Sequence, residues 1–247
     1  RDSQACPSYE FRVSFGVTVI VHRVILCLAV VGALAGCGGA PSGAASADLA
    51  RARNSWAGTW HAVWEIEWHD APVIGPLVAE MWHSADGHLR IETLEAPVAA
   101  LNGLTLVSTG DEAWLYDVRS NQAQSGARDL VRVPLADDML SAMDWLLAET
   151  GAASIGKTTR DVLESGAAWQ LQVILPSGDE ATLWLTESDG FPAGFALRSG
   201  RWGTVRCVTR WLEQPQRLDH RLFDPQPPVG ATIVQSRSAT TQTPALQ

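Results

Sequence analysis

One segment of the chain matches the pattern of a nucleotide-binding loop. Residues 151–158 read G-A-A-S-I-G-K-T and satisfy the pattern G-x-x-x-x-G-K-[ST]. A working loop of this kind needs a buried strand before the first glycine and a helix after the lysine, whose amino end faces the phosphates. Here a helical pattern precedes the motif, a strand pattern follows it, and no apolar run ending in Asp supplies a magnesium ligand. We therefore predict no nucleotide and no other cofactor.

Metal and nucleophile chemistry has equally little support. His61, His69, His83 and His88 lie in or beside the first three expected strands, without a His-x-x-x-His helix or a His/Asp cluster of metal-binding spacing. Solvated histidines on strand faces are the favoured interpretation. No G-x-S-x-G elbow occurs, and Cys207, between Val and Trp residues, is expected to be a small buried hydrophobe. We predict no metal site, no catalytic residues and no enzymatic activity.

Tryptophan is the residue type that points to a ligand. The chain has 11 Trp against 5 Phe and 2 Tyr. Candidate cavity residues on the expected strands are Trp60, Trp64, Trp68, Trp82, Trp114, Trp169 and Trp184. Core packing is the alternative for any single ring, and also for Met139 and Met143 on an expected helix. As a set, these rings fall on several expected strands and cannot all fill one small core, so they are candidates for lining an apolar cavity together with the helix that carries both methionines.

The charge balance argues against a nucleic-acid partner. The net charge is −9, and the first 36 residues carry +1, so the remainder is more acidic than the whole chain. Nucleic-acid binders neutralise phosphates with clustered cations. We predict no nucleic-acid binding.

The N-terminal region resembles a bacterial lipoprotein signal. Residues 24–36 form an apolar run behind His22 and Arg23 that is too short to cross a hydrocarbon core of about 30 Å. The run ends in L-A-G followed by Cys37, the pattern in which lipid such as palmitate is attached to the thiol. A plain secretory signal with an accidental Cys is the alternative. Gly38 is not the Asp that marks inner-membrane retention, so a host with two membranes would place the protein at the outer one.

These features predict the domain organisation. Residues 1–36 are expected to be the export signal, although 1–20 lack an initiator Met and are expected to precede a true start near Val21. Residues 37–47 comprise the lipidated Cys and a Gly-, Ala- and Ser-rich flexible tether, and two or three acyl chains would anchor the protein to the cell envelope. One domain over 48–235 and a disordered tail over 236–247 follow. Cys207 then has no intramolecular disulfide partner.

Hydrophobic periodicity predicts a mainly β domain with few helices. Residues 59–69 alternate with Trp60, Trp64 and Trp68 on one side, which indicates a half-buried strand. Turn residues separate nine further expected strands, so that a meander of about ten antiparallel strands is predicted. The further strands are 77–84, 88–94, 104–109, 113–118, 158–163, 169–175, 181–187, 193–199 and 204–212. A short helix over 48–55 and an amphipathic helix over 137–149 complete the prediction.

Several motifs together resemble the LolA-like superfamily of lipoprotein carriers and sorting proteins, LolB, RseB and lipid-binding lipoproteins of the LppX and LprG type. They are H-L-R-I-E at 88–92, G-D-E-A-W-L-Y-D at 110–117, L-W-L-T-E-S-D-G-F-P at 183–192 and L-F-D-P-Q-P-P-V-G-A at 222–231. The resemblance implies a strongly curved antiparallel sheet, an incomplete barrel with a helical lid, whose concave face holds acyl chains. The expected function is a membrane-anchored lipoprotein that binds lipid or lipoprotein acyl chains as a carrier or sorting factor. An envelope-stress, sigma-factor regulatory or assembly module acting through an envelope protein partner is the alternative.

Overall fold

The computed structural model describes residues 43–69 and 75–235, which belong to one compact unit. The predicted export signal, Cys37 and the predicted tail over 236–247 lie outside the described residues. Within the described ranges, no helix is long and apolar enough to span a bilayer.

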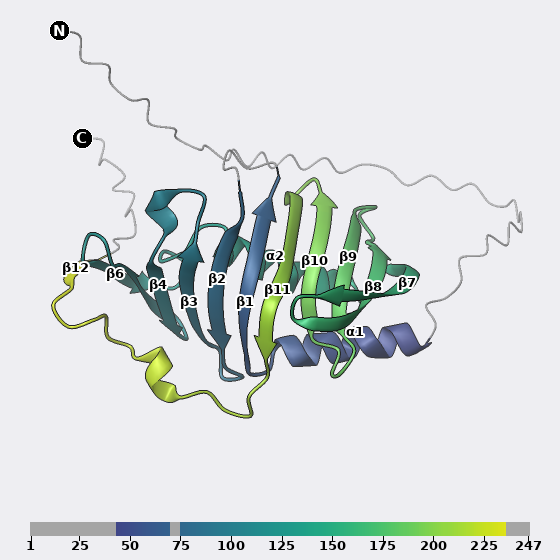
Figure 1. Ribbon diagram of the computed structural model, residues 1–247, viewed down its shortest axis with the longest axis horizontal. Helices are drawn as coiled ribbons and strands as arrows, with labels where there is room; N and C mark the ends of the chain where they lie inside the picture. The colour runs from purple at the N-terminus through teal and green to yellow at the C-terminus, as the bar shows by residue number, and fades with distance from the viewer. Residues whose placement is uncertain (1–42, 70–74, 236–247) are drawn as a thin grey trace, which may run out of the picture. The chain divides into compact units, whose positions relative to one another are not determined.

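Twelve strands of the described chain form one sheet (Figure 1). The strands are β1 (Trp60–Trp68), β2 (Leu77–His83), β3 (His88–Glu95), β4 (Leu104–Thr109), β5 (Glu112–Asp117), β6 (Gln122–Ala127), β7 (Ser154–Leu163), β8 (Gly166–Ile174), β9 (Glu180–Thr186), β10 (Pro192–Ser199), β11 (Gly203–Glu213) and β12 (Thr232–Gln235). The helices are α1 (Gly43–Trp56) and α2 (Ala136–Glu149), with short 3-10 turns η1 (Ala99–Leu101) and η2 (His220–Phe223). The predicted mainly β class is confirmed.

The sheet consists of two meanders joined in the middle. Its strand order is β12-β6-β5-β4-β3-β2-β1-β11-β10-β9-β8-β7, and the pairing of β1 with β11 joins the halves. Every pair is antiparallel except β12 with β6, which is parallel. The prediction of ten strands, all antiparallel, is wrong in two respects: β6 and β12 are additional strands, and they pair with each other in parallel. The β6 sequence Q-A-Q-S-G-A buries only Ala123, so it shows no apolar alternation that would reveal a strand.

The first strand forms as its period-two pattern predicts. In β1 the side chains alternate between buried and partly exposed from Trp60 to Ile66. The helix over 136–149 also matches its prediction, whereas α1 begins at Gly43, inside the stretch predicted as a flexible tether. Alanine at 44, 45 and 47 has the highest helix propensity, which favours this extension.

Both helices cover the same face of the sheet (Figure 1). Trp56 of α1 and Met139 of α2 pack in one core with Trp60 and Trp64 of β1. The opposite face carries two smaller apolar clusters, one beneath η2 and one beneath the β7–β8 hairpin. The sheet is curved and is not closed into a barrel, as the resemblance implied.

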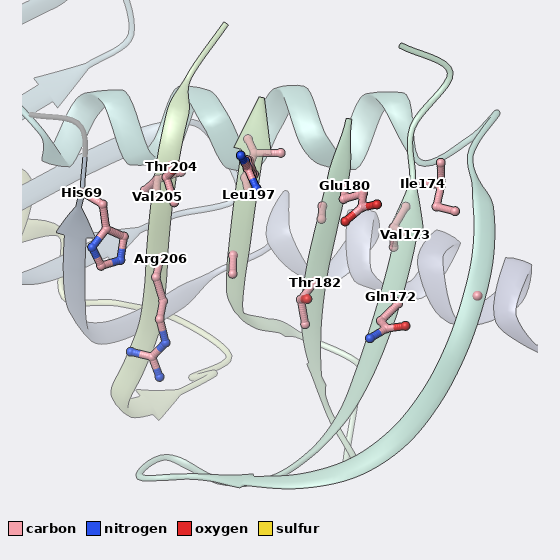
Figure 2. A pocket seen from close by; sticks show the side chains of 14 residues that line it. His69, Gln172, Val173, Ile174, Glu180, Thr182, Leu197, Thr204, Val205 and Arg206 are labelled. Carbon is pink, nitrogen blue, oxygen red and sulfur yellow. The ribbon is translucent and has the colours of Figure 1, made fainter. Parts of the chain in front are cut away.

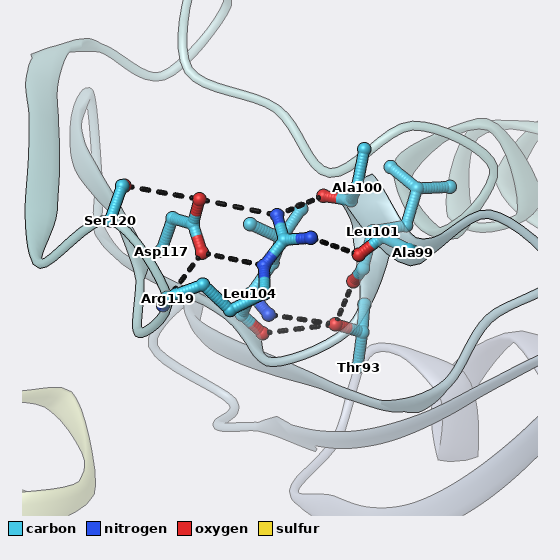
Figure 3. Close-up of polar contacts among 8 residues, drawn as sticks. All are labelled: Thr93, Ala99, Ala100, Leu101, Leu104, Asp117, Arg119 and Ser120. Carbon is cyan, nitrogen blue, oxygen red and sulfur yellow. Dashed lines mark hydrogen bonds and ion pairs between the residues drawn. The ribbon is translucent and has the colours of Figure 1, made fainter.

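Hydrogen bonds hold the connection between β3 and β4, which contains η1, against neighbouring strands and turns (Figure 3). Arg119, after β5, donates from Nη2 to the Ala100 carbonyl at 2.9 Å and from Nε to Asp117 at 3.0 Å. The Arg119 hydrogen bond is the largest cause that lowers the pKa of Asp117 below its ordinary value. Thr93, buried at 3% exposure, accepts the Leu104 N–H at 2.9 Å. These contacts fix the η1 loop against the β5–β6 turn.

Candidate functional site

A cluster of aromatic rings forms the centre of the layer between the helices and the sheet. Trp56 stacks on Trp60 with ring centroids 4.9 Å apart, and Trp64 meets Trp56 edge-on at 6.0 Å. Phe191, at the end of the β9–β10 turn and directly before β10, lies 5.9 Å from Trp60. Trp60, Trp64 and Phe191 are all less than 2% exposed. The sequence placed Trp60 and Trp64 on one strand face, and the structure adds rings from α1 and from the β9–β10 turn.

The predicted helical cover is present over this cluster. Met139 and Met143 of α2 are fully buried and belong to the same core as Trp60 and Trp64. Methionine is unbranched and flexible, so it adapts its shape to changing neighbours more easily than Leu or Ile does. Protein side chains occupy the centre of this layer, and a pocket lies at its edge.

The Trp64 indole N–H, at the centre of the layer, has no partner among the described residues. Trp56 donates from Nε1 to Asp144 Oδ1 at 2.6 Å, and Trp60 donates from Nε1 to the Trp56 carbonyl at 2.9 Å. Trp64 Nε1 is buried and makes no hydrogen bond within the described chain. A buried unpaired donor costs about 1–3 kcal/mol, and native proteins seldom keep one without a reason. An acceptor oxygen of a ligand would remove this cost.

A pocket of about 270 Å³ opens beside α2 and leads to these rings. Trp56, Trp60, Leu89 and Leu140 supply its apolar walls. Its polar lining residues are His83, Ser108, Arg128, Asp137, Ser141 and Asp144. The pocket therefore combines apolar walls with polar side chains, and its volume lies just below the roughly 300–1,000 Å³ of small-molecule sites. We call it the edge pocket.

Ion pairs and hydrogen bonds hold both ends of α2. At its start, the Asp137 carboxylate pairs with Arg128 and accepts the Val133 N–H at 2.5 Å. At its end, Arg53 of α1 donates from Nε to the Leu147 carbonyl at 2.7 Å. Between these anchors, α2 contacts the sheet through apolar side chains.

The other predicted cavity rings lie elsewhere. Trp68 is partly buried at the border of the helix-side core and donates from Nε1 to the Trp202 carbonyl at 3.0 Å. Trp82 and Trp114 pack with Phe223 on the opposite face of the sheet. Because of this placement, Trp82 and Trp114 do not share the helix-covered face with Trp60 and Trp64.

Two rings belong to the β7–β9 region. Trp184 lies beneath the β7–β8 hairpin, on the face opposite the helices, and donates from Nε1 to Asp161 Oδ2 at 2.8 Å. This hydrogen bond is the largest cause that lowers the pKa of Asp161. Trp169 of β8 is 44% exposed. The structure thus brings Trp60, Trp64, Met139 and Met143 together and separates Trp184 and Trp169 from them.

The nucleotide-loop pattern, the strand histidines and Cys207 have structural positions in the fold. Lys157 of the nucleotide-loop pattern lies within β7, so a strand stands where a phosphate-binding helix would have to begin. His61 Nε2 lies 2.7 Å from Glu80, whereas His83 Nδ1 lies 2.8 Å from the Gly58 carbonyl. Among the described residues, no group of three or more His, Cys, Asp or Glu side chains is arranged to hold a metal ion. Cys207 is fully buried as predicted, and burial raises its pKa well above the ordinary value of a thiol.

Sequence reasoning missed several pocket residues. Trp56 lies at the end of α1, and its four-residue spacing from Trp60 is a signal that the strand pattern of β1 obscures. Phe191 stands in a turn between two strands, where no periodicity indicates burial. Arg128 and Asp137 lie on two elements whose proximity becomes visible only in the folded chain. These residues complete the edge pocket or the ring cluster beside it.

The similarity of this chain to known proteins lies in the fold. No family model matches the sequence, and no curated protein matches it. A conserved uncharacterised protein from Thermus thermophilus is 16% identical, covering 78% of this chain and 99% of its own, with a TM-score of 0.50. A LolA superfamily protein from Nitrosomonas europaea is 10% identical, covering 72% of this chain and 96% of its own, with a TM-score of 0.31. The Thermus thermophilus protein therefore shares the fold of this chain.

MucB is also among the similar solved structures. It is 15% identical with a TM-score of 0.49, and the match covers 78% of this chain and 66% of MucB. This chain therefore spans about two thirds of MucB. At such identities the similarity concerns the arrangement of strands and helices and transfers no activity.

Proposed function

We propose that this chain binds lipid, or the acyl chains of lipoproteins, between α2 and the curved sheet. The edge pocket carries the proposal, because it connects the surface beside α2 with the buried rings of Trp56 and Trp60. A binding role without catalysis is part of the proposal.

The energetics of the layer suit an apolar chain. Burial of each methylene stabilises a complex by about 0.8 kcal/mol before the ordering costs are subtracted. Side chains fill the layer, so entry of an acyl chain requires α2 to shift outward from the sheet. Met139 and Met143 can repack around an inserted chain more readily than branched residues would. A carboxyl or ester oxygen near Trp64 would accept the indole N–H that lacks a partner.

The membrane anchor is a separate part of the proposal. Lipidation of Cys37 would attach the chain to the cell envelope, at the outer membrane in a host with two membranes. Treating membranes of cells that express the chain with detergent should release it, and Cys37→Ala should make it leave the membrane fraction without detergent. Recovery of both forms in the soluble fraction would contradict the anchor without affecting the edge pocket.

Two substitutions on α2 test the binding site. Ser141 is exposed and borders the edge pocket, whereas Ala148 is exposed on the same helix and lies outside the pocket lining. Ser141→Trp should obstruct the entrance and weaken binding of a fluorescent fatty acid about tenfold. Ala148→Trp is the matched control and should bind like the unmodified chain. Thermal unfolding of both variants verifies that the fold is retained.

Solvent extraction provides an independent readout. Mass spectrometry of an organic extract of the purified Cys37→Ala chain should detect lipid, and the Ser141→Trp chain should carry less of it. An extract without lipid, together with no response to fatty-acyl probes, would contradict lipid binding. Equal binding by both tryptophan variants would remove the edge pocket as the entrance.

The alternative function is an envelope-stress regulatory or assembly module that acts through protein contacts. A solved structure describes Pseudomonas aeruginosa MucA and MucB as a complex. In the present chain, Trp211 is 40% exposed and meets His61 edge-on at 4.5 Å, and exposed Trp side chains are frequent at protein interfaces. Protein partners that co-purify with the Ser141→Trp chain but are lost with Trp211→Ala would favour this alternative.

A further inference from the structure

A second hollow lies on the face of the sheet opposite the helices. This groove has a volume of about 420 Å³, within the roughly 300–1,000 Å³ range of small-molecule sites. Figure 2 shows the side chains of Arg206, Thr182 and Gln172 in front of neighbouring strands, with β7 curving around the far side. We call it the hairpin groove, because the β7–β8 hairpin forms its wall.

Strand register explains why polar side chains meet on this face. On β10, Arg198 lies opposite Glu180 of β9 and Thr204 of β11. Two residues earlier, Ala196 lies opposite Thr182 and Arg206. Side chains two positions apart share a face of a strand, so these residues form two adjacent rows. The small Ala196 side chain stands in the middle of its row and leaves the space that the groove occupies.

The β7–β8 hairpin closes one end of the groove. Ser165 and Thr209 hydroxyl oxygens lie 2.7 Å apart, which joins the hairpin turn to β11. Trp184 and Val208 fill the space beneath the hairpin with Ala168. Gly156 of β7 lines the groove and contributes no side chain to it. The hairpin therefore encloses a hollow that is open at the end carrying Arg198.

The charged groups of the groove favour an anion. Arg198 is exposed and makes no hydrogen bond or ion pair within the described chain. Arg206 forms an ion pair with Glu67 at 3.8 Å, which balances its charge, although this separation is too long for a hydrogen bond. Among the described lining residues, Glu180 is the one carboxylate, and it makes no ion pair with Arg198. Arg198 is therefore the guanidinium of the groove that is free to hold an anion.

We propose that the hairpin groove binds a small oxyanion that carries an apolar body. The Arg198 guanidinium holds the carboxylate or phosphate head through its planar fork of N–H donors, with Arg206 beside it. The apolar body lies over Ala196 and Ile174. This site is separate from the edge pocket, since the two lie on opposite faces of the sheet.

Isothermal titration with hexyl phosphate tests the charge requirement in the full chain. Arg198→Gln should weaken binding about tenfold, because a hydrogen-bonded charged group is removed. Glu180→Gln should strengthen binding about two- to fivefold, because a repelling carboxylate is removed. Arg221→Gln, at an exposed position in η2, makes the same charge change outside the groove and should leave binding unchanged. Hexanol, which lacks the charge, should bind much more weakly than hexyl phosphate.

Opposite results would overturn the proposal. If Glu180→Gln weakens binding of hexyl phosphate and Arg198→Gln strengthens it, the phosphate is not held by Arg198 and the proposal fails; if neither changes binding, the groove is not the site. Ala196→Phe should fill the groove and abolish binding of hexyl phosphate. The Arg198 and Glu180 side chains are exposed and make no hydrogen bond or ion pair within the described chain, so their variants keep the test decisive even where Ala196→Phe fails to fold.

A second pair of measurements identifies the source of the oxyanion. Vesicles containing phosphatidylglycerol, compared with vesicles of neutral phosphatidylcholine, report whether a lipid headgroup reaches Arg198. Binding to the anionic vesicles that Arg198→Gln reduces would assign the site to a lipid headgroup. Binding of hexyl phosphate alone would assign it to a free organic anion, and no binding of either probe would refute the oxyanion site.

Discussion

Replacement of Asp137 by alanine should lower the free energy of unfolding by about 3 kcal/mol. The Asp137 side chain is 4% exposed, and it pairs with Arg128 while accepting the Val133 N–H at 2.5 Å. Removal of one partner from a buried ion pair costs about 3–5 kcal/mol, since the other charge stays unpaired. Arg128 is 25% exposed, so water solvates its charge in part and the expected loss lies at the lower end of this range.

A double-mutant cycle isolates the pair. Urea unfolding of Asp137→Ala, Arg128→Ala and the double variant should yield a coupling energy of about 1–2 kcal/mol, because the interaction is lost only once in the double variant. Asp137→Asn keeps an acceptor for the Val133 N–H and loses the charge, so it should destabilise by about half as much as Asp137→Ala. An unchanged slope of free energy against urea would show that unfolding remains comparable among the variants.

Specific results would refute the reasoning. A coupling energy below about 0.5 kcal/mol would show that Asp137 and Arg128 contribute independently. Equal losses for Asp137→Asn and Asp137→Ala would assign the whole effect to charge, with no part for the hydrogen bond to Val133. Both residues border the edge pocket, so faster entry of a fatty-acyl probe into Asp137→Ala would also link the start of α2 to access.

Three further predictions follow from individual contacts. Gly194→Ala should lower the free energy of unfolding in urea by about 1–3 kcal/mol, because its Cβ would lie 2.8 Å from the Cys207 carbonyl oxygen. Gly200→Ala is the control: no atom lies within 4 Å of its Cβ, so it should change stability by less than about 1 kcal/mol. Equal effects of the two substitutions would contradict the steric argument. The pKa of Asp161 is lowered chiefly by the Trp184 hydrogen bond, so its contribution to stability is complete at neutral pH and is lost as the pH falls through the lowered pKa. Trp184→Phe should raise that pKa in an NMR titration, and an unchanged value would refute the assignment. Burial raises the pKa of Cys207, so peptide mapping after iodoacetamide treatment should find this thiol unmodified in the folded chain and alkylated in urea; alkylation without urea would show that the site opens readily.

Local patterns were sufficient to predict most strands and α2. Turn residues such as Asp86 and Gly87 separate alternating segments, and β2 and β3 pair around them as expected. The sequence of α2 repeats apolar residues at helical spacing, and Met139 and Met143 of the predicted apolar face are buried. By contrast, β12 becomes a strand because residues 232–235 lie beside β6 in parallel, a partner distant along the chain. No local signal encodes that pairing.

The tryptophans show where sequence reasoning ends. Alternation correctly places Trp60 and Trp64 on one face of β1, but it does not predict the register between β1 and β2. In the structure His61 lies opposite Trp82, so Trp82 faces away from Trp60. A shift of one residue in register would have reversed this result, because successive side chains of a strand point to opposite faces. The candidate rings therefore divide between two faces of the sheet.

The amino-acid sequence by itself determined the mainly β class, most of the strands and the amphipathic helix α2, because these depend on hydrophobic periodicity and turn residues within short segments. Only the tertiary structure decided the register between strands, the faces on which the Trp side chains lie, and the two hollows. The edge pocket requires α2 beside β1, and the hairpin groove requires the β7–β8 hairpin beside β11. Such features depend on contacts between residues far apart in the chain, whose geometry the whole packed sheet sets.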